Sequence, residues 1–239
     1  MSLVFEYYFF VLDNLRYDDY NKIMNTDIFS SASCWPCRPL RAVAQVYVGM
    51  PIPRHLADER AGATVAVINV RDLSDGRLGP LGTLEVRRVA RGQRIDRYRV
   101  EAGDVVLTCR GTQLKIALVP EDMSGAVISS NLIAVRPGSQ LVPWVLFAFL
   151  QGPQGQTALL RQSRSSNLGI ALSPKSVGQI VVPVPPMEIQ ERIAALMRVA
   201  EENYVVARQA AEHRRLLARA VANNLLAMRP PTYRPKGAE

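Results

Sequence analysis

Short runs of apolar, β-branched residues, separated by Gly, Pro, Ser and Asp, occupy the middle of the chain. Runs of this kind between turn residues are typical of strands. We predict strands over residues 64–70, 104–109, 115–119, 126–135 and 179–184, and short helices over residues 142–150 and 157–162. Ser129, Ser130 and Asn131 interrupt one run, which indicates a structural turn or bulge there. The mixture predicts a mixed α/β (α+β) domain.

The pattern changes after Pro186. Residues 188–229 contain ten alanines and neither glycine nor proline, which favours a helix over the whole segment. At a rise of about 1.5 Å per residue, such a helix is about 60 Å long. Pro230 would end it. We therefore predict one long C-terminal helix over residues 188–229.

Apolar residues recur along this predicted helix at close to coiled-coil spacing. They are Ile189, Ile193, Leu196, Ala200, Ala207, Ala210, Leu217 and Val221. A helix of this length cannot bury such a stripe against one modest domain, and alanine lets two helix backbones approach closely. We predict that the stripe packs on a second helix. The alternative is a helix folded back on its own domain.

The charge balance favours an anionic partner. The chain has 29 Lys and Arg against 21 Asp and Glu, a net charge of +8. Residues 34–187 hold 18 basic and 10 acidic side chains, whereas residues 1–33 hold 2 basic and 5 acidic ones. Nearly all the basic residues are arginines, whose guanidinium groups suit bidentate contacts with phosphates and guanine edges. The cationic middle predicts nucleic acid or acidic lipid as a partner, although a GC-rich genome also enriches arginine.

The sequence contains no run of 18 or more apolar residues, and its apolar segment 4–12 has neither a basic flank nor a cleavage-site pattern. Its three cysteines, Cys34, Cys37 and Cys109, form no disulfide framework. These features predict a soluble, cytoplasmic protein with reduced thiols and no membrane partner.

Motifs of catalysis and cofactor binding are absent from the sequence. There is no phosphate-binding loop, dinucleotide-binding turn, nucleophile elbow or paired-histidine metal motif. Cys34 and Cys37 form a C-x-x-C pair, but no predicted strand precedes it, and a zinc site would need further ligands from Cys109, His55 and His213. We predict no catalytic residue, no metal, no cofactor and no enzymatic activity. A thiol redox protein using Cys34 and Cys37 is a distant alternative.

Three fragments, in this order and spacing, carry a resemblance to a known family. They are Gly103-Asp104-Val105-Val106-Leu107, Arg110-Gly111-Thr112 and Pro185-Pro186-Met187-Glu188-Ile189-Gln190. From about residue 40 to residue 228, the chain resembles the target recognition domain and following spacer helix of type I restriction-modification DNA specificity subunits. The best agreement lies between Gly103 and Ala194.

The resemblance implies how the chain is organised. Residues 1–33 are an N-terminal extension of unknown role, 34–187 a target recognition domain, 188–229 a spacer and dimerisation helix, and 230–239 a tail. Full-length family members have two recognition domains and two antiparallel spacer helices, whereas this chain shows one of each. We expect two copies to pair through the helix and read a bipartite site. Pairing with a second specificity chain, or a truncated remnant, stays open.

The resemblance also implies function and partners. The expected function is sequence-specific binding of double-stranded DNA in a bacterial defence system, without chemistry of its own. The expected protein partners are an adenine methyltransferase (modification) subunit and an ATP-dependent restriction subunit. The alternative is a non-DNA assembly protein that docks partners through its C-terminal helix.

Polar and cationic side chains in two segments are the main candidate DNA contacts, since hydrogen bonds read base edges and cations bind phosphates. Residues 87–99 hold six arginines in thirteen positions, and residues 161–167 form a polar stretch with two more. A third group follows the predicted strand 104–109. The candidates are Arg87, Arg88, Arg91, Arg94, Arg97, Arg99, Arg110, Gln113, Lys115, Arg161, Arg164, Ser165 and Asn167. For each arginine, a charged and solvated surface is the alternative.

Overall fold

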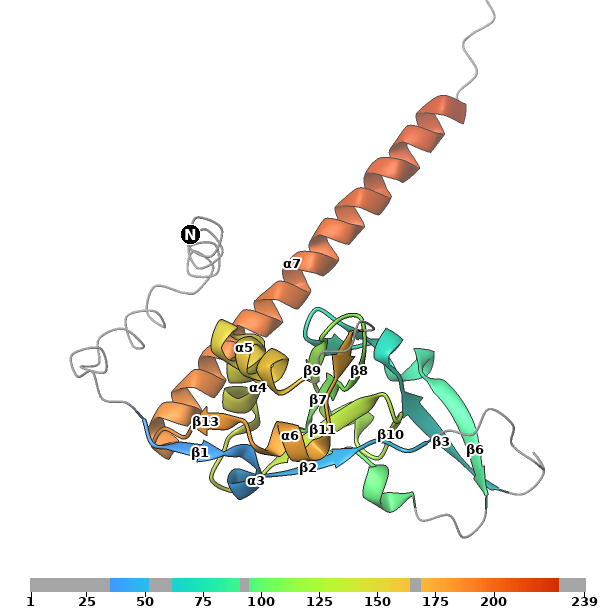
Figure 1. The fold of residues 1–239 in the computed structure, drawn as a ribbon. Coiled ribbons are helices and arrows are strands. Elements are labelled where there is room, and N and C mark those ends of the chain that lie inside the picture. Colours follow the sequence, from blue (N-terminus) through green and yellow to red (C-terminus); the bar gives the residue numbers. More distant parts are fainter. Residues whose placement is uncertain (1–34, 52–61, 91–94, 164–168, 228–239) are drawn as a thin grey trace, which may run out of the picture. The chain divides into compact units, whose positions relative to one another are not determined.

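The computed structural model describes residues 35–51, 62–90, 95–163 and 169–227 (Figure 1). The predicted N-terminal extension and the tail from residue 230 lie outside these residues. So do Cys34 and His55, and the candidate contacts Arg91, Arg94, Arg164, Ser165 and Asn167.

The chain divides into two compact units. One contains the described residues up to Met197, and the part of the C-terminal helix from Arg198 onward belongs to the other. No helix among the described residues is long and apolar enough to cross a membrane. The domain boundaries predicted from the sequence stay predictions.

Strands and helices alternate in the first unit, which confirms the predicted mixed α/β (α+β) class. The strands are β1 (Cys37–Pro39), β2 (Ala44–Val48), β3 (Gly62–Ile68), β4 (Leu73–Ser74), β5 (Arg77–Leu78), β6 (Glu85–Ala90), β7 (Val105–Thr108), β8 (Arg110–Gly111), β9 (Ile116–Leu118), β10 (Val127–Ile128), β11 (Leu132–Pro137), β12 (Ile170–Ala171) and β13 (Val181–Pro183). The α-helices are α3 (Leu40–Val43), α4 (Pro143–Gln151), α5 (Pro153–Gln162), α6 (Pro174–Gly178) and α7 (Met187–Ala227). Short 3-10 helices are η2 (Val70–Asp72), η3 (Leu81–Thr83), η4 (Asp96–Tyr98) and η5 (Glu121–Met123).

A four-stranded antiparallel sheet, in the order β2-β11-β7-β9, lies between two apolar cores. Val105 and Leu107 of β7 face the core that contains residues of α4 and α5. Val106, one position along, faces the core that contains Ile68 and Leu73. Successive side chains of a strand point to opposite faces, so a strand covered on both faces has an unbroken apolar sequence. This explains why the sequence of this strand shows no polar alternation.

A second sheet, in the order β10-β3-β6, pairs β10 parallel and β6 antiparallel to β3. The single strand predicted over residues 126–135 is therefore wrong, because its two halves, β10 and β11, belong to different sheets. The polar turn predicted at Ser129 is the transfer point: its amide donates to Ile68 O at 2.9 Å, and its carbonyl accepts from Leu132 N at 2.9 Å. A Cβ on Gly49 would lie 2.2 Å from the Ser129 carbonyl oxygen, so the close crossing requires glycine here.

The predicted long helix is confirmed as α7, a continuous helix over Met187–Ala227. Its first turns belong to the first unit, where Gln190 and Ala194 are buried and Ile193 packs against the α4–α5 core. In the second unit, apolar side chains of α7 are exposed. They include Val206, Leu216, Leu217, Val221, Leu225 and Leu226.

Candidate nucleic-acid interface

Asp104, the acidic residue of the Gly-Asp fragment, is 1% exposed and is the centre of a polar network. Arg136 on β11 binds both of its carboxylate oxygens, with Nε to Oδ1 and a terminal nitrogen to Oδ2, each at 2.9 Å. Tyr47 Oη donates to Oδ2 at 3.0 Å, and the Glu101 amide donates at 2.9 Å. These hydrogen bonds to the buried charge all come from the domain itself. The Gly-Asp fragment is therefore a structural element and not a DNA contact.

The same network fixes the end of the arginine-rich segment. The carbonyl oxygen of Arg99, just after η4, accepts from Arg136 at 3.0 Å and lies 2.9 Å from Tyr47 Oη, whose one proton is shared between this oxygen and Asp104 Oδ2. Burial, then the nearby charge of Asp104, raises the pKa of Tyr47. Hydrogen bonding to Asp104 raises the pKa of Arg136. Tyr47 therefore stays a neutral donor and Arg136 a cation at any physiological pH.

Most described members of the arginine-rich segment already have partners within the domain. The Arg87 guanidinium pairs with Glu85. Arg97 donates to Tyr98 Oη and lies over its ring, 4.6 Å from the centroid. Arg99 pairs with Asp96 and donates to the carbonyl oxygen of Gly125. Their predicted role as DNA contacts stays a prediction. For Arg87 and Arg99, however, the structure provides a clear structural role.

A second group of candidates comes together at the small antiparallel sheet of β8 and β12 (Figure 1). Arg110 on β8 pairs with Ala171 on β12, whose amide donates to Ser163 Oγ at 3.0 Å, two residues after Arg161. Arg110 and Arg161 are exposed, as is Gln113 in the turn after β8. A Cβ on Gly169 would lie 2.4 Å from Gly111 O, so this glycine permits the close approach. The β8–β12 edge, defined by Arg110, Gln113 and Arg161, presents cations and an amide to solvent.

Lys115 is placed differently from the other candidate contacts nearby. Its Nζ donates to the carbonyl oxygen of Val70 at 3.2 Å, and its backbone pairs with Thr108. It thus links β9 to η2 within the domain. This bond uses one of the three N–H donors of the ammonium group and restricts where the side chain can point.

Gln190, from the third sequence fragment, is the main hydrogen-bonding residue at the start of α7. It is 1% exposed. Its Oε1 accepts from Val142 N at 2.8 Å, and its Nε2 donates to Gln140 O at 3.0 Å and Pro185 O at 2.8 Å. One side chain therefore ties α7 to the start of α4. The sequence fragment that carried the family resemblance is an anchor for the helix.

No protein-family model and no curated protein matches this sequence. Solved structures do match. A chain from a study of complex assembly and conformational transition of the type I R-M system is 18% identical, with a TM-score of 0.55 over 85% of this chain and 49% of that one. The type I restriction-modification S subunit from M. genitalium is 13% identical, with a TM-score of 0.50 over 84% of this chain and 50% of that one. This chain has the specificity-subunit fold.

The HsdS subunit from Thermoanaerobacter tengcongensis is also similar, at 18% identity and a TM-score of 0.49 over 90% of this chain and 55% of that one. The chain spans about half the length of the solved chains that it matches with TM-scores of 0.55 and 0.50. Within the specificity-subunit fold, it supplies one mixed domain and one long helix.

Thiols and metal ligands add no second site to the described part of the fold. Cys37 is exposed and Cys109 is buried, and both are free thiols. Burial raises the pKa of the Cys109 thiol, which keeps it protonated and unreactive. No three His, Cys, Asp or Glu side chains of the described ranges group as metal ligands.

Several exposed cations were not among the predicted contacts, because arginine density along the sequence does not reveal cations without a counter-charge. Arg38, Arg41 and Lys175 are exposed, and the side chain of none of them forms an ion pair or hydrogen bond with another described residue. An isolated cation in a short segment without nearby Asp or Glu is the signal that could have found them.

Proposed function

We propose that the chain is the DNA specificity subunit, or half-subunit, of a type I restriction-modification system. The observation that carries the proposal is the specificity-subunit fold, shared over 85% of this chain with a TM-score of 0.55. The exposed side chains of the β8–β12 edge support it, because arginine and glutamine side chains donate to base edges and phosphates. The chain would bind DNA and catalyse nothing, and it would use no cofactor.

The partners follow from this function. A chain that selects a sequence without cutting or methylating it needs a methyltransferase subunit and an ATP-dependent restriction subunit to act at the site. We infer that it recruits both, and that it works in the cytoplasm where the DNA is. The protein would thus be the subunit of a defence system that selects the DNA sequence on which the other subunits act.

We further infer that two copies pair through α7 to read a bipartite site. The chain covers about half of the matched subunits, so one copy would supply one half of the recognition surface. On α7, an apolar groove is lined by Arg214, Leu217, Ala218, Val221, Ala222 and Leu225. Leu217 is 66% exposed and Val221 50%. A second α7 in coiled-coil packing would cover this groove.

Selection from a random duplex library tests the DNA function. Full-length protein, mixed with a type I methyltransferase subunit, is expected to enrich a motif of two short halves separated by a fixed spacer. The two halves should be inverted copies if the protein is a homodimer. Sequencing of the bound fraction at moderate salt is the measurement, and the absence of any enriched motif would contradict the proposal.

A variant of the β8–β12 edge sharpens this test. Arg110→Gln with Arg161→Gln is expected to relax the motif at the positions these side chains read, at a cost of about 1–3 kcal/mol for each base that is no longer read. A matched control is Arg192→Gln with Arg215→Gln. These two arginines pair with Glu188 and Glu212 on α7, and replacing them removes the same amount of positive charge. Equal enrichment by both variants would count against the β8–β12 edge.

Charge placed in the α7 groove should abolish pairing. Leu217→Glu with Val221→Glu would bury carboxylates at the helix contact. A cost of about 1.4 kcal/mol in the free energy of association for each substitution lowers the association constant about 10-fold each time. We expect the dimer dissociation constant to rise at least about 100-fold, seen as a monomer by light scattering. Leu216→Glu is the control, because Leu216 is 51% exposed on α7 but does not line the groove. A dimer that survives the double substitution would rule out pairing through this groove.

A further inference from the structure

Three cations of the first unit share a property that Arg87, Arg97 and Arg99 of the arginine-rich segment lack. Arg38 on β1, Arg41 on α3 and Lys175 on α6 are exposed. Among the described residues, the side chains of these three have no ion-pair or hydrogen-bond partner. Arg87 and Arg99, by contrast, pair with Glu85 and Asp96. A cation without a counter-charge keeps its full attraction for an anionic ligand.

The fold brings the three cations to neighbouring elements. The Leu40 amide, between Arg38 and Arg41, donates to Ile180 O at 2.8 Å, which ties β1 and α3 to the segment after α6. A Cβ on Gly178 of α6 would lie 3.3 Å from Cβ of Arg41, so Arg41 packs directly on the helix that carries Lys175. β1, α3 and α6 lie together in Figure 1.

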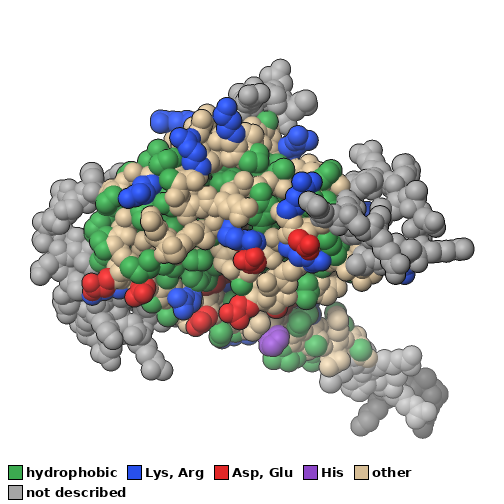
Figure 2. Space-filling view, turned by 90° about the horizontal axis from the view of Figure 1, so that it is seen from below, with side chains coloured by type: hydrophobic (Ala, Val, Ile, Leu, Met, Phe, Trp, Pro, Cys, Tyr) green, Lys and Arg blue, Asp and Glu red, His purple; other side chains and the backbone are tan. Residues whose placement is uncertain are grey.

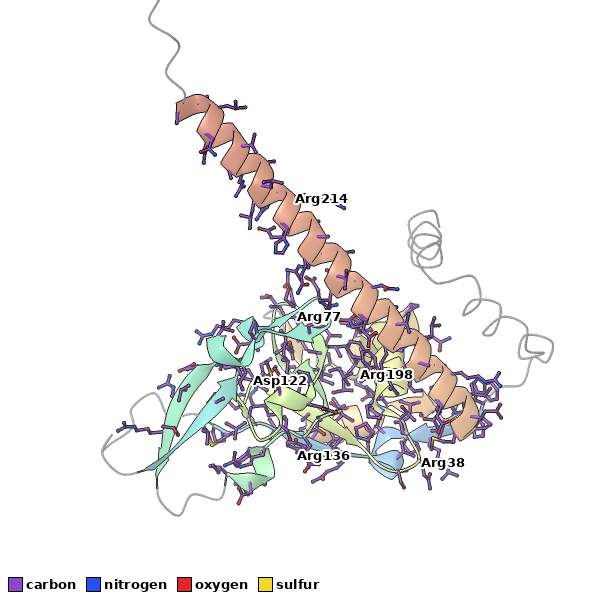
Figure 3. All side chains as sticks on the ribbon, turned by 180° about the vertical axis from the view of Figure 1, so that it is seen from behind. Arg38, Arg77, Asp122, Arg136, Arg198 and Arg214 are labelled. Carbon is purple, nitrogen blue, oxygen red and sulfur yellow. The ribbon has the colours of Figure 1, made fainter. Side chains whose placement is uncertain are left out.

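An open cleft adjoins this group. Its volume is about 450 Å³, and its polar lining consists of Arg41, Gln45, Arg136, Ser139 and Gln140, with no acidic side chain. The Ser139 and Gln140 residues are exposed, and among the described residues their amides have no backbone acceptor. Figure 3 places Arg38 and Arg136 at the same edge of the domain. The cleft therefore offers hydrogen-bond donors next to the uncompensated charge of Arg41, whereas its Arg136 is already paired with Asp104 and Glu101.

Basic side chains are also spread across the surface that Figure 2 shows from below, with acidic side chains among them in the middle and lower part of the view. The β8–β12 edge lies elsewhere in the domain (Figure 1). Two separate cationic surfaces thus exist on one domain.

We propose that Arg38, Arg41 and Lys175 form a phosphate-binding surface that holds the backbone of duplex DNA, with the adjacent cleft receiving a phosphate group. This proposal rests on the proposed DNA-binding function and assigns this surface to positioning and not to sequence reading. Phosphate contacts fix register and orientation on a duplex and carry no sequence information. The free positive charge of the surface and the hydrogen-bond donors that line the cleft match a phosphodiester. In this proposal, the Gln113 amide and the two arginines of the β8–β12 edge read the bases.

The test is the salt dependence of binding to a duplex of unrelated sequence. In the full-length triple variant Arg38→Gln, Arg41→Gln, Lys175→Gln, each phosphate that is no longer neutralised removes about 0.9 from the slope of log K against log salt. We expect the slope to fall by about 2.7, and the affinity at 0.1 M salt to fall about 500-fold. The motif enriched from a random library should be unchanged.

The matched control is Arg71→Gln, Arg192→Gln, Arg215→Gln, which removes three charges that already pair with Glu85, Glu188 and Glu212. Its slope should change by less than about 1. Equal slopes for the two triple variants, or an unchanged slope for Arg38→Gln, Arg41→Gln, Lys175→Gln, would overturn this proposal. The proposed function would still stand if the natural chain selects a motif. Loss of methyltransferase binding with unaltered DNA binding would assign the surface to an acidic protein partner and overturn it too. If the natural chain binds no DNA at all, both proposals fail.

Discussion

Asp104→Ala is expected to destabilise the domain by about 3–5 kcal/mol, the cost of removing one partner from a buried ion pair. The substitution leaves the Arg136 guanidinium, the Tyr47 hydroxyl and the Glu101 amide without their shared acceptor. Urea unfolding, followed by circular dichroism, measures the change in the free energy of unfolding. A cost below about 1 kcal/mol would show that the network contributes no more than a surface pair.

An exposed ion pair provides the comparison for this prediction. Arg192 and Glu188 pair at 2.7 Å on the surface of α7, and Glu188 is 73% exposed. Arg192→Ala should change the free energy of unfolding by at most about 1 kcal/mol, because solvent screens the pair. The double variant Asp104→Leu, Arg136→Met should be more stable than Asp104→Ala, because it also removes the Arg136 guanidinium, which Asp104→Ala leaves with only the exposed Glu101 as a carboxylate partner. The contrast separates the charge from the volume of the side chain.

The Asp104 network also determines how the arginine-rich segment is presented. Arg136 and Tyr47 both hydrogen-bond the carbonyl oxygen of Arg99, so removal of the Asp104 carboxylate would release the end of η4. Arg97 and Arg99, the described candidate contacts of this segment after β6, would then lose their fixed position. Under the proposed function, substitution of Asp104 would thus weaken DNA binding through the backbone that the network holds, without any contact between Asp104 and DNA.

Local sequence predicted the secondary structure well where packing agreed with the local pattern. The apolar run of β7 and the alanine-rich, glycine-free stretch of α7 gave the correct element type because burial and helix propensity act in the same direction there. The prediction of one strand over residues 126–135 was wrong, because periodicity cannot show that Ser129 hydrogen-bonds to Ile68 of another sheet. Sheet membership depends on partners that are distant in sequence.

The same limit applies to the candidate site. Gly103-Asp104 and Pro185-Pro186 with Gln190 were recognisable as fragments, but their physical role depends on Arg136, 32 residues from Asp104, and on Val142, 48 residues from Gln190. Arginine density over 87–99 suggested a DNA surface, yet Glu85 and Asp96 compensate two of those charges. A lone charge inside an apolar strand, such as Arg136 on β11, is a sequence signal for a buried partner. Charge compensation itself is visible only in three dimensions.

Gln190→Leu is expected to loosen the start of α7 and to destabilise the first unit by about 3 kcal/mol. Leucine has a similar size but neither accepts from Val142 N nor donates to the carbonyl oxygens of Gln140 and Pro185. A buried polar group left without a partner costs about 1–3 kcal/mol, and here three lose theirs. Hydrogen exchange of the amides in residues 187–197 should speed up, with urea unfolding giving the total cost.

Gln209→Leu is the matched control, since Gln209 is exposed on the same helix and its replacement should change stability by about 0.5 kcal/mol or less. If the two variants behaved alike, Gln190 would not anchor α7.

The functional consequence of Gln190→Leu follows from the proposed pairing of two chains through this helix. A fixed spacer between two half-sites requires each recognition domain to be held rigidly at the start of its α7. Gln190→Leu should therefore widen the range of spacer lengths in the motifs enriched from a random duplex library and leave each half-motif unchanged. Leu217→Glu with Val221→Glu, which prevents pairing, should instead enrich single half-motifs.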